Sequence, residues 1–464
     1  METQKLLTLA RSDKGNAEAL YLLYGKDIRY CTAKDKWLIW QDDHWREDDG
    51  AYVRNLLRQS GRHRMALFKD SGLSDEIRAS LFTWLAGCEN ERRVGPAYKA
   101  AMDMRELQVR EEDLDASVWG LGLRGSEFDL GEMRVKKPNP LSYITRRMAT
   151  IYDSAADCPR WKQFLAEIFQ GDERLMEFVQ VAAGYCLTGS IKEQVMFVCV
   201  GEGANGKSTF LGTLYKLFGD YAGSTPFSTF DAKSRSEATN DLARLKGKRF
   251  VTIMETDEDS YLAEQKVKQA TGEDPITCRF HYKEFFEYIP QFKIWMATNR
   301  IPSIKGVDYG IRRRLIIIPF EARFDATQRD PNLSRTLSGE LPGILNWVLE
   351  GAQKWKEKGL HPFLPKRSVD VAEEYTEEVD HLGNWIAESL EVGEGDLGKE
   401  ERKERAIDLY TSYKNWMLAR SHRPKSITRW GQDMRSKGFD NKRKEQPGVV
   451  YIGVRLRPEA LMGN

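Results

Sequence analysis

The stretch that decides the fold is Gly201-Glu202-Gly203-Ala204-Asn205-Gly206-Lys207-Ser208-Thr209, which fits the phosphate-binding pattern GxxxxGK[ST] in full. Residues 195–200 before it are continuously apolar and predict a buried parallel strand, and apolar residues recur at helical spacing over 210–218. The pattern therefore predicts a strand, a loop and a helix in that order. Such a loop turns its backbone N–H groups toward phosphates, and the helix adds the positive end of its dipole.

The chemistry of this loop indicates ATP and Mg²⁺ as cofactors. We expect Lys207 to reach the β- and γ-phosphates and Ser208 to hold Mg²⁺. The residues expected to bind the nucleotide are Gly201, Gly203, Ala204, Asn205, Gly206, Lys207, Ser208 and Thr209.

Three further apolar runs, 250–254, 292–297 and 315–318, predict buried strands, and helical stretches lie between some of them. Strands that alternate with crossovers predict an α/β core with a parallel sheet. We place this core, a P-loop ATPase domain, at residues 151–369.

Polar side chains follow two of these strands. Glu255 comes directly after 250–254, where a carboxylate can position Mg²⁺ and polarise the attacking water; Asp257 and Glu258 are alternatives. Asn299 closes the stretch after 292–297 and could sense the γ-phosphate. We therefore expect Glu255 and Asn299 to be catalytic, with Glu255 also a metal ligand.

Arginines 312–314 precede the last strand. A guanidinium from any of the three could stabilise charge that develops on a transferred phosphoryl group. A different basic group, Arg279, His281 and Lys283, alternates with aromatic residues. In an extended segment these three would share one face and could hold the backbone phosphates of a nucleic acid.

Charge divides the rest of the chain. The whole chain has 464 residues and a net charge of +1, so any nucleic-acid affinity must come from local patches. Residues 370–398 contain ten acids and no Lys or Arg, which predicts an acidic linker; residues 399–464 carry 16 Lys or Arg against 8 Asp or Glu. Two helices near 409–416 and 428–437, then strands at 449–452 and 454–456, predict a basic winged-helix-like DNA-binding domain.

Residues 1–150 predict an N-terminal α+β domain, with aromatic-rich strands near 28–30 and 37–40 followed by helical spacing over 51–110. The six cysteines form no CxxC pair and suit small core positions in a reducing cytosol. No signal peptide and no run of 18 apolar residues is found, so we expect a cytoplasmic protein, in a bacterial host, that does not associate with membranes.

Taken in order, GEGANGKST, the acidic strand end, the segment Lys268-Gln269-Ala270-Thr271-Gly272-Glu273-Asp274, WMATN ending at Asn299 and RRRLIIIPF resemble superfamily 3 helicases. The resemblance is to the helicase part of phage and plasmid primase-helicases and the related poxvirus protein, and it covers roughly residues 25–380. It implies an AAA+-type ring ATPase, hexameric, that moves 3′ to 5′ on single-stranded DNA.

Carried over by position, the resemblance makes Arg314, or Arg313 beside it, an arginine finger. Family members often have Trp where this chain has Arg312, so the register of the finger stays open by one residue. Lys268 begins the segment that leads to a DNA-gripping hairpin around residues 279–283.

The expected function is thus an ATP-dependent helicase that acts on single-stranded and forked DNA in the replication of a phage, plasmid or other mobile element. We find no primase signature, and we interpret Asp113-Leu114-Asp115 as structural. A separate primase, polymerase or initiator is a possible partner. The alternatives are a non-replicative ring ATPase and a DNA-binding initiator that uses ATP only as a switch.

Overall fold

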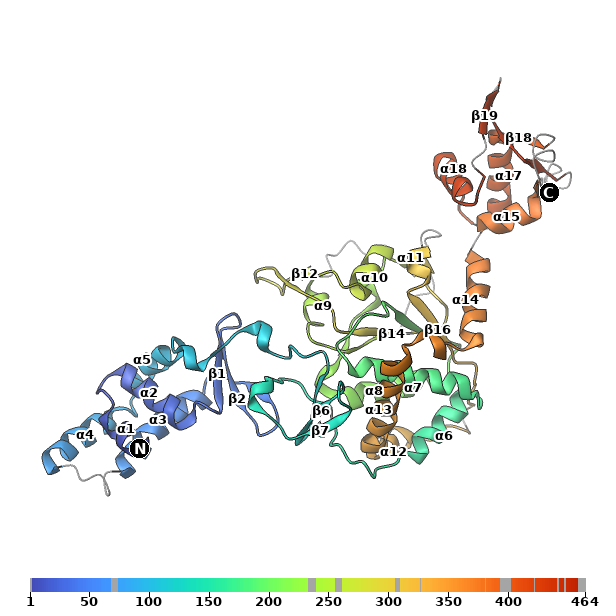
Figure 1. The fold of residues 1–464 in the computed structure, drawn as a ribbon. Helices are drawn as coiled ribbons and strands as arrows, with labels where there is room; N and C mark the ends of the chain where they lie inside the picture. The colour runs from blue at the N-terminus through green and yellow to red at the C-terminus, as the bar shows by residue number, and fades with distance from the viewer. Residues whose placement is uncertain are drawn as a thin grey trace. The chain divides into compact units, whose positions relative to one another are not determined.

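The computed structural model describes residues 2–67, 74–232, 239–254, 261–304, 309–325, 327–379, 381–392, 402–420, 422–439, 442–445 and 448–457 (Figure 1). The chain forms two compact units, Met1–Pro365 and Lys366–Asn464, which we describe separately. None of the helices in the described ranges is long and apolar enough to cross a bilayer.

A five-stranded parallel sheet forms the centre of the first unit. Its order is β16-β8-β14-β10-β9, where the strands are β8 (Met196–Val200), β9 (Ala222–Ser224), β10 (Phe250–Met254), β14 (Lys293–Thr298) and β16 (Leu315–Pro319). The four predicted strands are confirmed to within one residue at each end. The fifth, β9, was not predicted, because Ala-Gly-Ser has no strand signature. Since all five strands run the same way, their carboxyl ends meet at one edge.

Helices cover this sheet and complete the core. They include α6 (Pro159–Ile168), α7 (Glu173–Leu187), α8 (Lys207–Phe218), α12 (Leu333–Gly339) and α13 (Leu341–Lys358). The backbones of α7 and α13 approach so closely that a Cβ on Gly184 would lie 2.1 Å from the Ala352 nitrogen. Shorter elements complete the ATPase region: α9 (Thr239–Ala243), α10 (Glu264–Thr271), α11 (Tyr309–Arg312), β11 (Tyr261–Leu262), β15 (Ser303–Ile304) and the hairpin β12 (Ile276–Cys278) and β13 (Phe286–Tyr288).

The N-terminal part of the first unit is α+β, as predicted. A mixed sheet of order β3-β2-β1-β4 packs with a helical cluster, and a separate antiparallel sheet has the order β5-β6-β7. The helices are α1 (Glu2–Thr8), α2 (Asp13–Tyr24), α3 (Tyr52–Ala66), α4 (Asp75–Gly87) and α5 (Glu91–Met102). The strands are β1 (Ile28–Cys31), β2 (Lys36–Trp40), β3 (Trp45–Glu47), β4 (Gln108–Val109), β5 (Gly120–Leu123), β6 (Ser126–Asp129) and β7 (Arg134–Lys136).

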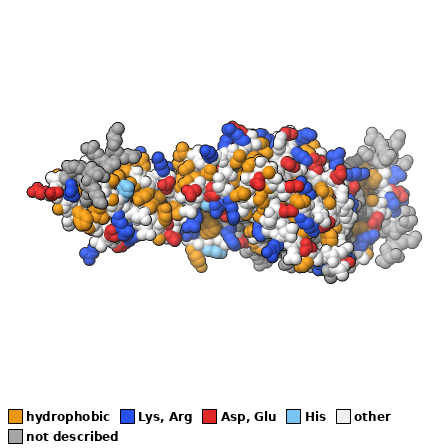
Figure 2. Space-filling model, turned by 90° about the horizontal axis from the view of Figure 1, so that it is seen from below, with side chains coloured by type: hydrophobic (Ala, Val, Ile, Leu, Met, Phe, Trp, Pro, Cys, Tyr) orange, Lys and Arg blue, Asp and Glu red, His pale blue; other side chains and the backbone are white. Residues whose placement is uncertain are grey.

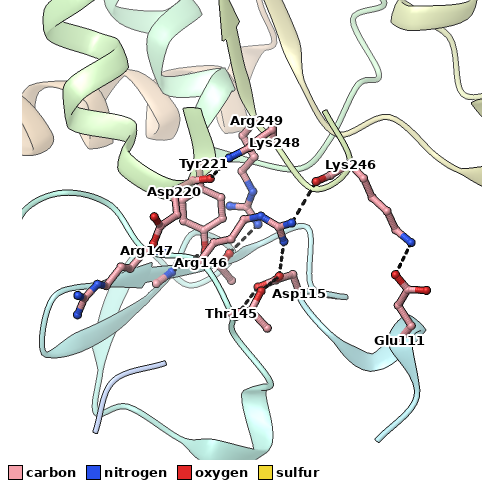
Figure 3. A network of polar contacts seen from close by, with 12 residues as sticks. Glu111, Asp115, Thr145, Arg146, Arg147, Asp220, Tyr221, Lys246, Lys248 and Arg249 are labelled. Carbon is pink, nitrogen blue, oxygen red and sulfur yellow. Dashed lines mark hydrogen bonds and ion pairs between the residues drawn. The ribbon is translucent and has the colours of Figure 1, made fainter. Parts of the chain in front are cut away.

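A polar network joins the N-terminal part to the ATPase sheet (Figure 3). Asp115 accepts hydrogen bonds from the Thr145 backbone, at 2.7 Å, and from the Arg146 guanidinium, which also donates to the Lys246 carbonyl at 3.0 Å. The Lys246 ammonium donates to Glu111 Oε1 at 2.6 Å. Asp115 therefore has the structural role predicted for it.

Arg249 extends the same network into the core, immediately before β10. It is buried and donates to the carbonyls of Ser117 and Gly120 at 3.1 and 2.8 Å, while its guanidinium lies 4.6 Å from the Tyr221 ring centroid. A buried arginine that binds carbonyl groups from the N-terminal part fixes that part against β9 and β10.

The second unit has the connectivity of a winged helix: α15 (His381–Ser389), β18 (Lys403–Arg405), α17 (Ala406–Ala419), α18 (Ile427–Ser436), β19 (Lys442–Glu445) and β20 (Gly448–Ile452), with sheet order β18-β20-β19. The wing hairpin is β19–β20. The sequence had suggested 449–452 with 454–456, but β21 (Val454–Leu456) pairs instead with β17 (Leu390–Val392). With the parallel α/β core, the N-terminal α+β part and this unit, the predicted fold class is confirmed.

The acidic segment 370–398 forms regular structure in its described part. It contains most of α14 (Lys366–Val379), all of α15 and the strand β17, and Trp385 of α15 is fully buried in the core of the second unit with Leu382 and Leu390. The segment has the composition of a linker because it contains ten acids, of which Glu373, Glu388 and Glu391 are exposed in the described part. All six cysteines are buried and free of disulfides, as predicted.

Lysine and arginine side chains are mixed with aspartate and glutamate over the face seen in Figure 2, in keeping with the net charge of +1.

Candidate nucleotide and DNA sites

The loop Gly201–Gly206 connects the carboxyl end of β8 to the first residue of α8, Lys207, as the motif predicts. Gly206 caps the helix with φ of +86°, a conformation that side chains disfavour. A Cβ at this position would also lie 2.4 Å from Ile168 Cγ2 of α6. Glycine is therefore required here both by backbone conformation and by the close approach of α6.

The segment after β16 holds the phosphate-binding loop from the other side. Asn205 Nδ2 donates to the Phe320 carbonyl at 3.2 Å, and the Phe324 N–H donates to the Ala204 carbonyl at 2.8 Å. The Gly201 N–H donates to the Thr298 carbonyl at 3.3 Å, which ties the loop to the end of β14. The loop is thus positioned by two neighbouring strands before any ligand binds.

Lys207 is buried, with a relative exposure of 7%. Its ammonium contacts the Gly201 carbonyl and lies 3.2 Å from Asn205 Oδ1. Burial lowers the pKa of Lys207, because it penalises the charged form. A phosphate beside the ammonium would favour the charged form, so the loop concentrates its one cationic side chain where a phosphate would lie.

A cavity of about 420 Å³ opens beside this loop. It is lined by residues 204–209, by Arg160 and Phe164 of α6, and by Phe324, Arg329 and Leu333 from beyond β16. The volume suits a small organic ligand, and the wall combines apolar rings with charged groups. The sequence gave no signal for the α6 and post-β16 residues, because they come from segments far from the motif.

Ser208 lines the same cavity at the start of α8, and its hydroxyl could join phosphate oxygens and water around Mg²⁺, which takes few protein ligands. The described residues contain no group of three or more His, Cys, Asp or Glu that could hold a metal by itself. The expected acidic partner, Glu255, and its alternatives Asp257 and Glu258 lie outside the described residues.

The strand order places Asn299 close to the loop. β14 lies between β8 and β10, with Thr298 opposite Val200 and Ala297 opposite Met254. Asn299 follows β14 directly and is exposed at the carboxyl edge of the sheet. The structure therefore brings Asn299 and the phosphate-binding loop to the same edge of the sheet. The carboxyl end of β10 lies at this edge as well.

Arg313 and Arg314 lie at the opposite edge, because they precede β16. Leu315 pairs with Met196 at the amino end of β8, five residues before the loop begins. At about 3.3 Å per residue, these five residues place the amino end of β8 about 16 Å from the first residue of the loop. Neither arginine can reach the nucleotide loop of its own chain, whereas a neighbouring copy of the chain could present one.

The two arginines differ in their surroundings. Arg314 is half-buried, its Nη1 donates to Thr271 Oγ1 at 3.1 Å, and its Nε is buried. Burial and the adjacent Arg313 lower the pKa of Arg314. Arg313 is exposed. Of these two, Arg313 is therefore the arginine more open to solvent, and the side chain of Arg312 lies outside the described residues.

The predicted DNA residues lie on α10 and the β12–β13 hairpin. Lys268 forms an ion pair with Glu264 one turn earlier on α10, at 2.5 Å. Arg279, His281 and Lys283 belong to the seven-residue connection 279–285, which contains a turn and is not extended. The shared strand face predicted for them does not form, but all three remain in the projecting end of one hairpin.

Comparison with known proteins gives two family matches. Residues 17–170 match the family described as D5 N terminal like, and residues 199–314 match a family of unknown function (DUF5906). The second match contains the phosphate-binding loop.

Relatives among curated proteins are viral. The chain is 29% identical over 417 residues to the protein named "Putative helicase L207/L206" of Acanthamoeba polyphaga mimivirus. This match covers 82% of this chain and 43% of the relative. The chain is 26% identical over 277 residues to "Putative helicase 022R" of Frog virus 3, covering 56% of this chain and 28% of the relative. The chain thus spans less than half the length of these relatives. Among solved structures, the NrS-1 C-terminal region aligns with 95% of this chain and 98% of its own length, at 10% identity and a TM-score of 0.49.

Proposed function

We propose that this chain, a D5-like relative of the viral superfamily 3 helicases, uses ATP hydrolysis to move along single-stranded DNA and to separate the strands of forked DNA. The observation that carries the proposal is the division of the catalytic groups between two edges of one sheet. The phosphate-binding loop and Asn299 lie at the carboxyl edge, and Arg313 lies at the amino edge. A complete ATP site therefore needs two copies of the chain.

Each residue then has a defined role in hydrolysis. The backbone of the loop and the Lys207 ammonium hold the β- and γ-phosphates, and Ser208 with Glu255 would hold Mg²⁺, which would supply positive charge against the charge that develops during hydrolysis. Asn299 orients the attacking water at the exposed end of β14. Arg313 of the neighbouring copy stabilises the charge that spreads over the transferred phosphoryl group.

Repetition of this head-to-tail contact closes a ring, and we propose a homo-hexamer that moves 3′ to 5′. The β12–β13 hairpin contacts the single strand through His281 and Lys283. The winged-helix unit contacts duplex DNA through the exposed face of α18, which carries Arg429 and Arg435. The process served is replication of a virus, phage or plasmid, together with a primase, polymerase or initiator.

ATPase activity with and without single-stranded DNA tests the proposal. The wild-type chain should hydrolyse ATP, and single-stranded DNA should stimulate it. Lys207→Ala should abolish both rates while it leaves the melting curve nearly intact, because the Lys207 side chain, although buried, belongs to the polar site at the start of α8 and not to the apolar core. Wild-type turnover in Lys207→Ala, or a wild-type rate that single-stranded DNA does not change, would contradict the proposal.

A double variant of the hairpin provides the second arm. His281→Ala with Lys283→Ala should keep basal ATP hydrolysis, since the hairpin is not part of the nucleotide site, and should lose the stimulation by DNA. Stimulation that survives unchanged would show that the DNA contact lies elsewhere.

A further inference from the structure

The β12–β13 hairpin projects from the ATPase region and is firmly anchored at its base (Figure 1). Its strands pair from Ile276 with Tyr288 to Cys278 with Phe286. The Tyr288 hydroxyl donates to the Leu242 carbonyl of α9 at 2.6 Å. A rigid base of this kind gives the residues of the connection a defined position.

One aromatic side chain stands apart at the end of this hairpin. The Lys283 N–H donates to the Phe280 carbonyl at 3.1 Å and closes a turn around Tyr282. Tyr282 has a relative exposure of 104%, so its ring packs against no part of the described chain. Its ring centroid is 6.3 Å from that of His281, which is also exposed.

Three other side chains of the connection, Arg279, Phe280 and Phe285, contact partners within the hairpin. The Phe280 ring stacks on Phe286 with the centroids 5.8 Å apart and the planes inclined at 28°. The Arg279 guanidinium lies 4.5 Å from the Phe285 ring centroid. Arg279, Phe280 and Phe285 nevertheless remain exposed, with Phe280 at 43% and Phe285 at 54%, so the Tyr282 ring is distinguished by its full exposure.

The backbone at Tyr282 gives a second, independent observation. Its φ is +62°, in the left-handed region that glycine and asparagine tolerate and a bulky side chain disfavours. The fold therefore bears a cost at this position and gains no packing from the ring in return. A strained residue with a fully exposed ring indicates a contact with a partner.

We propose that the Tyr282 ring stacks on a base of single-stranded DNA, while Lys283 and His281 beside it contact the phosphates. The partner is single-stranded because the faces of its bases are open, whereas duplex DNA stacks them internally. This inference rests on the proposed function, since it names the group that grips the strand on which the motor moves.

Abasic DNA separates stacking from charge. Binding of the full chain to a dT oligonucleotide and to an abasic oligonucleotide of the same length is measured in a salt titration, for wild type, Tyr282→Gly, Tyr282→Phe and Lys283→Ala. Tyr282→Gly should weaken dT binding by about 5- to 150-fold and leave abasic binding and the salt slope unchanged, because no phosphate contact is lost. Tyr282→Phe should bind like wild type.

Lys283→Ala is the matched control on the adjacent residue. It should weaken binding to both oligonucleotides and lower the log–log salt slope by about 0.7. Tyr282→Gly should melt no lower than wild type, because glycine accepts the left-handed conformation, so its weaker binding would not come from misfolding.

The outcomes are distinguishable. If wild type binds dT and Tyr282→Gly binds it equally well, the stacking inference is wrong and the proposed function stands. If Tyr282→Gly weakens dT and abasic binding by the same factor, the ring contacts the backbone and stacking is again excluded. If wild type binds neither oligonucleotide, both the inference and the proposed function fail.

Discussion

Substitution of Arg313 and of Arg314 should produce two different defects, because only one of these neighbours is available to a second copy of the chain. Arg313 is exposed and precedes β16, whose first residue, Leu315, pairs with Met196 about 16 Å from the loop of the same chain. Arg314 is engaged within its own chain by Thr271. We therefore expect Arg313 to be the arginine finger and Arg314 to stabilise the fold.

The magnitudes follow from these surroundings. Arg313→Ala removes an exposed side chain, so the free energy of unfolding should change by no more than about 0.5 kcal/mol. ATP turnover should fall by about 10³–10⁵, the contribution of an arginine finger, with nucleotide binding retained. Arg314→Ala removes a charged hydrogen bond to Thr271 and should cost about 1.5–3 kcal/mol of stability.

Mixing two inactive variants tests whether the site is shared. Arg313→Ala and Lys207→Ala each lack one half of the site, so mixed rings contain some interfaces with an intact loop and an intact arginine. ATP turnover should partly recover in the mixture, provided that fluorescence energy transfer between labelled subunits shows exchange. If exchange occurs and no activity returns at any ratio, or if Arg314→Ala rather than Arg313→Ala abolishes turnover without loss of stability, the reasoning is refuted.

Three other predictions concern the fold and the second unit. Burial lowers the pKa of Lys293 from 10.5 to about 7, so between these two pH values the unfolded chain holds a proton that the folded chain lacks, and stability should rise with pH. The melting temperature of wild type should show this rise and that of Lys293→Met should not, whereas the same pH dependence in both would contradict the assignment. Arg146→Ala breaks the network with Asp115 and should lower the free energy of unfolding by about 1–3 kcal/mol. Arg134→Ala removes only an exposed ion pair and should change this free energy little, so equal effects of the two substitutions would exclude a special role for the network. The double variant Arg429→Ala with Arg435→Ala should bind duplex DNA more weakly, with a log–log salt slope flatter by about 0.9 per lost contact, whereas Lys414→Ala on the exposed face of α17 should change neither quantity. An unchanged slope in the double variant would show that α18 does not contact the duplex.

The parts of the fold that the sequence predicted are those with a strong local signature. Continuous apolar runs identified β8, β10, β14 and β16, and the motif at residues 201–209 placed the loop between β8 and α8. Where tertiary partners supply the stability, local patterns failed. The strand β19 is Lys-Arg-Lys-Glu and pairs with the apolar β20, and the acidic segment folds because Trp385 is buried on α15.

The candidate site shows the same division. The position of the loop between β8 and α8 could be predicted, because the motif requires a strand before it and a helix after it. The choice between Arg313 and Arg314 could not, since it depends on Thr271, a residue 43 positions away. The left-handed backbone conformation of Tyr282 could not be predicted either, because alternation of basic and aromatic residues indicates an extended strand and not a turn.

Strand displacement on a forked duplex is the most direct test of the central claim, that ATP hydrolysis at this loop separates DNA strands. One strand of the fork carries a fluorophore and the other a quencher, and the single-stranded arms are blocked one at a time to define polarity. The account predicts displacement by the wild-type chain with ATP and Mg²⁺, entry from the 3′ arm, and no displacement by Lys207→Ala. DNA-stimulated ATP hydrolysis without displacement on any fork would contradict it, and would favour a ring ATPase or an ATP-switched initiator instead.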